Sequence, residues 1–80
     1  MKLPALRKLC QQCDLDTLKQ LEEELTEERP LSQPVEGEDE GEQLTHILGA
    51  IWVHEQVQQN GTDVKTELRN FSNRVRNSIG

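Results

Sequence analysis

One segment of the chain, residues 40–61 (EGEQLTHILGAIWVHEQVQQNG), is apolar on both sides when it is drawn as a helix. One side carries Leu44, Ile47, Leu48, Ile51 and Trp52. The nearly opposite side carries Ala50, Val53 and Val57, with Gly49 beside them. A helix that is apolar on both sides is buried on both. The rest of the chain can cover one side, so we expect a partner on the other: a second copy of the chain or a different protein.

Three further segments have the apolar spacing of amphipathic helices. Residues 3–12 begin a stripe formed by Leu3, Leu6, Cys10 and Cys13. Residues 14–29 align Leu15, Leu18, Leu21 and Leu25. Residues 62–79 have a narrow stripe, typical of a helix that meets a single neighbour, formed by Val64, Leu68, Phe71 and Val75. No strand alternation is present, so the predicted fold is all-α.

Signals at the helix ends indicate how these segments connect. Asp14 or Asp16 is the predicted N-cap of the second helix, and Thr62 or Asp63 is that of the last one. Gly61 is a strong C-terminal stop for the helix before it. Because the turn that follows is short, we expect the last two helices to form an antiparallel hairpin. The chain is thus predicted to be a small four-helix bundle-like protein that ends in a long helical hairpin.

The connection between the second and third helices, residues 29–41 (RPLSQPVEGEDEG), is rich in prolines, glycines and acids. This composition is typical of a solvated, flexible linker inside a single domain that spans residues 1–80. Leu31 and Val35 are available to fasten it to the bundle. An acidic docking segment for a basic partner is the alternative interpretation.

Composition limits the core and the possible partners. Only 32% of the 80 residues are hydrophobic and two are aromatic, so a single chain has little core to spare. The net charge is −6, and an acidic chain repels nucleic acid and anionic membranes on average. The longest apolar run, Ile47–Val53, is far shorter than the roughly 20 residues that span a bilayer. We expect a cytoplasmic homodimer without membrane or nucleic-acid partners.

Both cysteines lie in one C-x-x-C motif, Cys10 and Cys13, which is compatible with a redox dithiol, half of a zinc site or core packing. Helical redox motifs place the attacking cysteine at a helix N-terminus, whereas Cys10 lies near the end of its predicted helix. Asp14 and Asp16 disfavour a thiolate further. A structural zinc needs four ligands, and one motif supplies two. We interpret both thiols as core residues, with a redox or regulatory role and a shared metal as open alternatives.

The remaining polar residues form no catalytic constellation. His46 and His54 are eight residues apart on one helix, about 12 Å, which is too far to bind one ion. No nucleophile–base set and no Gly-rich phosphate loop is present. The sequence therefore predicts a protein that is not an enzyme and has no cofactor or metal.

The outer face of the last helix offers a minor alternative. It carries Arg69, Asn73 and Arg74 after a short turn, as a DNA-recognition helix does. Basic residues late in a helix also stabilise its dipole. Since the chain as a whole is acidic, a DNA-binding regulator is the weaker interpretation of these residues.

Several stretches resemble a family of short uncharacterised helical proteins from Bacteroidota and related bacteria. They are MKLP at the start, GAIWVHEQV at 49–57, Gly61, and LRNFSNRVRNSI at 68–79. The family pattern has an acid where this chain has Trp52, and it has no fixed C-x-x-C pair. The resemblance implies a helical fold and no particular activity. The residues that match the family pattern are candidates for a common fold or interface: Gly49, Ala50, His54, Phe71, Arg74 and Val75.

The predicted function is that of a small, non-enzymatic scaffold or protein-interaction module that self-associates through its third helix. The hypothetical interface consists of Gly49, Ala50, Trp52, Val53 and Val57. A thiol-based redox accessory protein that uses Cys10 and Cys13 is the alternative, ahead of a DNA-binding regulator.

Overall fold

The structure, a computed structural model, describes residues 2–79, with side chains through Val75. Residues 1 and 80 and the side chains of 76–79, which include parts of the family resemblance at both ends, lie outside the described part. The helices are α1 (Leu3–Gln12), α2 (Leu15–Thr26), α3 (Glu40–Asn60) and α4 (Val64–Ile79). No strand occurs among the described residues. The all-α prediction is confirmed.

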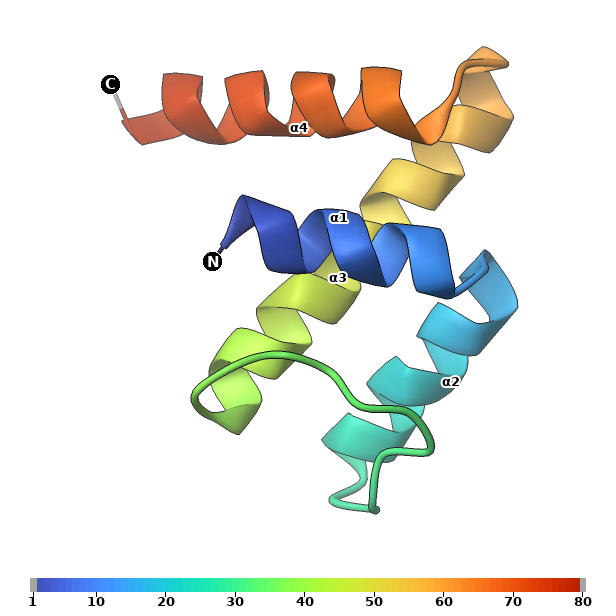
Figure 1. Ribbon diagram of the computed structural model, residues 1–80, viewed down its shortest axis with the longest axis vertical. Helices are drawn as coiled ribbons and strands as arrows, with labels where there is room; N and C mark the ends of the chain where they lie inside the picture. The colour runs from blue at the N-terminus through green and yellow to red at the C-terminus, as the bar shows by residue number, and fades with distance from the viewer. Residues whose placement is uncertain (1, 80) are drawn as a thin grey trace.

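The helix α3 is central, and each of the other three helices packs against it (Figure 1). α2 runs back alongside α3, whereas α1 and α4 lie side by side across it and run in opposite directions. The last two helices turn back on each other as predicted, but they cross obliquely instead of lying along one another. α4 therefore meets both α1 and α3, and the single neighbour predicted from its narrow stripe is wrong.

Gly49 allows α1 and α4 to come close to α3. A Cβ atom on Gly49 would lie 3.1 Å from Leu6 Cδ1 and 3.3 Å from Phe71 Cζ. Carbon atoms in contact prefer about 3.5–4.0 Å, so any side chain at this position would displace one of the two neighbours. Gly49, which the sequence placed in the hypothetical interface, is thus a point of close approach between helices of the same chain.

The hydrophobic core encloses both sides of α3. Side chains with an exposed fraction of 0% include Leu6, Leu18, Leu21, Ile47, Ala50 and Val53. Ala50 and Val53 belong to the side for which the sequence predicted a partner, and for these two residues that prediction is wrong. The physical reason is that three helices surround α3 instead of covering it from one direction.

The helix ends follow local signals. The carboxylates of Asp14, Asp39 and Asp63 each accept a hydrogen bond from the backbone N–H three residues later, at 2.7–2.8 Å. α3 ends at Gly61, whose φ of 63° is left-handed. The predicted caps at Asp14 and Asp63 and the predicted stop at Gly61 are therefore confirmed.

α2 ends in a left-handed turn that lacks the usual glycine. Glu28 has a φ of 58°, and its N–H donates to the Leu25 carbonyl at 3.2 Å. The N–H of Arg29 donates to the Glu24 carbonyl at 2.8 Å, which completes a Schellman motif. A side chain with a Cβ atom is strained in this conformation.

Residues 29–39 form neither helix nor strand, yet they contact the bundle at several points. Leu31 and Val35 pack on the core, as the sequence suggested. The thiol of Cys13 donates to Gln33 Oε1 at 3.2 Å, and Gln43 Nε2 donates to the Val35 carbonyl at 3.0 Å. The segment is therefore seated on the protein, while its flexibility stays a prediction.

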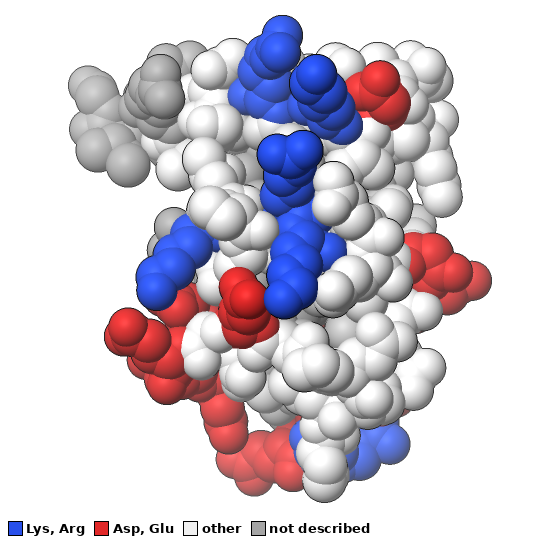
Figure 2. All heavy atoms as spheres, in the orientation of Figure 1, with Lys and Arg blue, Asp and Glu red and all other residues white. Residues whose placement is uncertain are grey.

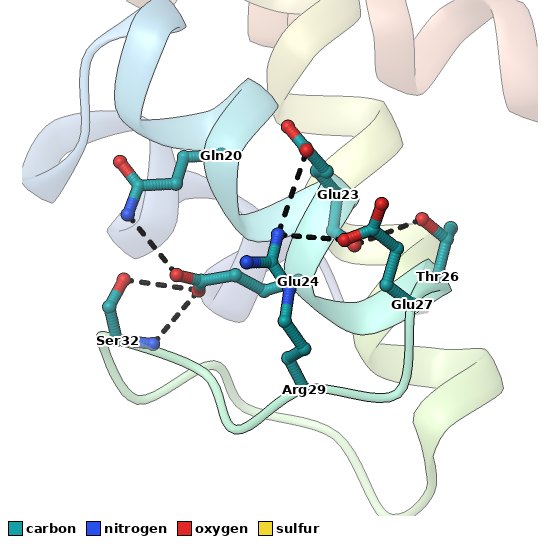
Figure 3. Close-up of polar contacts among 7 residues, drawn as sticks. All are labelled: Gln20, Glu23, Glu24, Thr26, Glu27, Arg29 and Ser32. Carbon is teal, nitrogen blue, oxygen red and sulfur yellow. Dashed lines mark hydrogen bonds and ion pairs between the residues drawn. The ribbon is translucent and has the colours of Figure 1, made fainter.

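Glu24 holds the start of this segment against α2 (Figure 3). Its carboxylate accepts hydrogen bonds from Gln20 Nε2 at 3.1 Å, from the Ser32 N–H at 2.9 Å and from the Ser32 hydroxyl at 3.1 Å. The Ser32 N–H contributes most to holding the pKa of Glu24 below its ordinary value. Nearby, Arg29 forms surface ion pairs with Glu23 and Glu27.

The two histidines of α3 hold other parts of the chain in place. His46, with an exposed fraction of 1%, contacts the Glu36 carbonyl through Nδ1 at 2.8 Å and accepts from the Lys2 N–H through Nε2 at 3.1 Å. Because a carbonyl only accepts and an N–H only donates, these two contacts fit the tautomer that carries its proton on Nδ1. Nε2 of His54 donates to the Cys10 carbonyl at 3.0 Å and so caps the end of α1.

The turn between α3 and α4 is built on the buried carboxylate of Glu67, whose exposed fraction is 1%. It accepts hydrogen bonds from the Thr62 hydroxyl and from the amides of Asn60 and Asn70. The Thr62 hydroxyl is the main cause of a pKa of Glu67 below its ordinary value, and burial opposes it.

Replacing Glu28 by Gly should raise the free energy of unfolding by about 1 kcal/mol, because glycine adopts the left-handed conformation without strain. Glu28→Ala is the matched control: it removes the same charge but keeps the Cβ atom, so it should stay within about 0.5 kcal/mol of the wild type. Urea denaturation measures both. Equal stabilities of the two variants would contradict the strain argument.

Glu67→Gln should weaken the dependence of stability on acid pH. A carboxyl with a lowered folded-state pKa stabilises the protein above its unfolded pKa, and that contribution is lost as the pH falls through the folded pKa. The free energy of unfolding of the wild type should therefore decline as the pH falls below 4.5, the ordinary pKa of a glutamate. The variant should lose part of this slope. Denaturation curves from neutral to acid pH test this, with Glu38→Gln as the control for losing one exposed carboxylate. An identical slope in both variants would argue against it.

Candidate functional site

An apolar hollow of about 470 Å³ lies between α3 and α4. We call it the α3–α4 face, and it is lined by Thr45, Leu48, Gly49, Trp52, Phe71, Arg74 and Val75. Leu48 is 47% exposed, the largest exposed fraction among the large hydrophobic side chains of the described residues. Periodicity explains the arrangement, since Thr45, Leu48 and Trp52 follow the spacing of one helix face.

An aromatic pair supports the middle of the α3–α4 face. The ring centroids of Trp52 and Phe71 lie 5.6 Å apart with the planes tilted by 50°. The guanidinium carbon of Arg74 lies 5.7 Å from the Trp52 ring centroid, in cation–π range. Trp52 is half-buried, so one part of the indole packs inside while another remains open to a partner.

The structure distributes the five residues of the predicted interface over different environments. Gly49 and Trp52 line the α3–α4 face, although Gly49 itself is buried beneath Leu6 and Phe71. Ala50 and Val53 are core residues and cannot meet a partner in this fold. Val57 is half-buried. Leu48, which lies on the exposed side, was not among the predicted interface residues.

A second hollow, of about 530 Å³, lies between α1 and α4. We call it the α1–α4 groove, and it is lined by Leu3, Pro4, Arg7, Lys8, Gln11, Val64, Lys65, Leu68 and Arg69. Sequence reasoning missed this groove. The available signal was the pairing of Arg7–Lys8 on one helix with Lys65 and Arg69, four residues apart, on another.

Charge is unevenly distributed over the surface. In Figure 2, most of the visible Lys and Arg side chains form a band across α4 and α1, whereas most Asp and Glu side chains lie around α2 and the connection to α3. Four of the nine basic residues line the α1–α4 groove, and no acidic residue does so in the described part of the chain. The groove is therefore locally basic on a chain whose net charge is −6.

The two cysteines are buried, free thiols. Burial, followed by the proximity of Cys13, raises the pKa of Cys10 to about 12. Burial and the nearby Asp14 also raise the pKa of Cys13. Both shifts oppose the thiolate form on which thiol–disulfide chemistry depends. The geometry favours the interpretation of both residues as part of the core.

The other candidate residues do not converge on one site. Arg69 lines the α1–α4 groove, whereas Arg74 lies over Trp52 on the α3–α4 face. His46 and His54 bind backbone groups of different segments. Within the part of the chain that the structure describes, no three His, Cys, Asp or Glu side chains come together as metal ligands. No described helix has the length and apolar character needed to cross a membrane.

Comparison with known proteins places the chain in a family. No curated protein and no solved structure matches it. A model of the Family of unknown function (DUF6952) matches residues 1–80, which is the whole chain. This agrees with the resemblance to uncharacterised helical proteins, and the chain belongs to this family of unknown function.

Proposed function

We propose that the protein is a non-enzymatic interaction module that forms a homodimer through the α3–α4 face. The observation that carries the proposal is the exposure of Leu48 beside the half-buried Trp52 on a face whose lining is largely apolar. The proposed self-association still involves α3, as the sequence predicted. It uses the side of α3 that carries Leu48 instead of the side that carries Val53.

Charge favours a second copy as the occupant of this face. A two-fold contact places the same patch on both copies, so a charged patch would face its own charge. Among the described residues, Arg74 is the one charged residue that lines the α3–α4 face, and its guanidinium is already placed over the Trp52 ring. The α1–α4 groove, in contrast, would oppose cations to cations.

The surface area of the chain is compatible with such a dimer. A stable contact buries about 800 Å² per partner, roughly 15% of the 5331 Å² that this chain exposes. Small chains bury a modest share of their surface when they fold alone, and dimerisation adds to it. We further propose that the dimer acts in the cytoplasm of bacteria, among them the Bacteroidota that the sequence resemblance suggests.

Leu48→Glu should convert the dimer to a monomer of 9.2 kDa without unfolding the chain, because the position is exposed. Light scattering at micromolar concentration measures the mass, and circular dichroism checks the helical content. Leu3→Glu is the matched control: Leu3 is 43% exposed but lies in the other hollow, so this variant should stay dimeric. Val53→Asp should instead unfold the chain, since it buries a charge in the core.

Two results would refute the proposed dimer. One is a wild-type protein that remains monomeric over the whole concentration range. The other is a Leu48→Glu variant with an unchanged mass, which would place the contact elsewhere.

The redox alternative is tested through the thiols. With raised pKa values, Cys10 and Cys13 should react slowly with a thiol reagent in the native state and fast in urea. Replacing either one by Ala should lower the free energy of unfolding by about 1 kcal/mol through lost packing. Fast native labelling, or a measured thiol pKa near neutrality, would favour the redox role over core packing.

A further inference from the structure

The geometry points to a second binding surface: we propose that the α1–α4 groove binds an acidic, amphipathic helix of a partner protein. This inference goes beyond the proposed dimer and uses different residues. It rests on two features that occur together in the groove, an apolar floor and a basic rim.

The floor consists of apolar side chains that remain partly exposed to solvent after the core has formed. Leu3 is 43% exposed, and Val64 and Leu68 of α4 are half-buried. Pro4 lies beside Leu3 at the start of α1. A hollow of about 530 Å³ falls within the range of about 300–1,000 Å³ typical of ligand sites. Several apolar side chains of a partner can therefore be buried there.

Three of the four cations that line the rim form no ion pair among the described residues. Lys8 pairs with Glu36 at 3.5 Å, and both side chains are more than half exposed. Among the described residues, Arg7, Lys65 and Arg69 take part in no ion pair within 4 Å. These three exposed cations surround the floor, so carboxylates of a partner would find complementary charge at the edge of its buried apolar stripe.

The apolar floor favours a peptide over a nucleic acid. Phosphate groups would use the cations but would leave Leu3 and Leu68 without a partner. Single-stranded nucleic acids bind through aromatic side chains on which bases stack, and the described lining of this groove contains no aromatic residue. The net charge of −6 also opposes a polyanion as a whole.

The shape of the groove suits a short helix. Its walls are two helices that lie side by side, and helix-in-groove recognition uses apolar anchors at positions i, i+3, i+4 and i+7. The α1 wall extends from Leu3 to Gln11, about 12 Å, which corresponds to about two turns of a bound helix. The partner segment thus needs acids that flank a stripe two turns long.

A designed peptide provides the test, with leucines at those four positions, glutamates at most others and a fluorescent label. Its binding is followed by fluorescence anisotropy on the wild type and on the Leu48→Glu monomer. We expect saturable binding to both proteins, and weaker binding as the salt is raised from about 0.15 M to about 1 M. Peptides with serine for leucine or lysine for glutamate should not bind.

Matched protein variants locate the site. Arg69→Glu and Leu3→Glu should each weaken peptide binding about tenfold, the first through the rim and the second through the floor. Lys19→Glu makes the same charge change as Arg69→Glu on the exposed surface of α2, and should alter affinity by less than about twofold. Circular dichroism confirms that each variant is folded.

Several outcomes would overturn the proposal. Equal losses in Arg69→Glu and Lys19→Glu would mean a general charge effect. Tighter binding of a DNA or RNA oligonucleotide than of the peptide would assign the groove to nucleic acid. Competition by an unlabelled peptide of residues 29–41 would assign it to the acidic segment of a second copy, and absence of binding by the designed peptide would leave the groove without this role.

Discussion

At Gly49 the missing side chain lets Leu6 of α1 and Phe71 of α4 approach the backbone of α3 from two helices at once. This approach decides where α4 can lie, because Phe71 must fit over α3 while α4 also reaches α1. Both hollows follow from that position. One opens between α4 and α3, beside Phe71, and the other opens between α4 and α1.

The two hollows differ in the kind of partner that each can accept. The described lining of the α3–α4 face includes one cation, which an aromatic ring already contacts, so a copy of the same face would meet little repulsion. The α1–α4 groove carries four cations on a chain that is otherwise strongly acidic. A surface of that kind discriminates by charge, because it repels its own copy and attracts carboxylates. The two proposed contacts use different residues, so neither would block the other.

Local features of the fold were predictable from the sequence, whereas its packing was not. Asp14, Asp63 and Gly61 act within one turn of their own helix, so their roles could be inferred without knowing the neighbours. The burial of Val53 depends on how three helices surround α3. The spacing of apolar residues along one helix carries no information on that arrangement. For the same reason the α1–α4 groove was missed: Arg7 and Arg69 belong to opposite ends of the chain and meet only after folding.

The histidine contacts tie the two halves of the chain together in a way that bears on how it folds. Lys2 and His46, and likewise Cys10 and His54, lie 44 positions apart. Closing such loops costs chain entropy before the contacts compensate for it. With both sides of α3 dependent on other helices, neither the first two helices nor the last two have a core of their own. The buried apolar residues of the described part lie between Ala5 and Val53. We therefore expect a single cooperative transition, which during synthesis on the ribosome becomes possible once α3 has emerged.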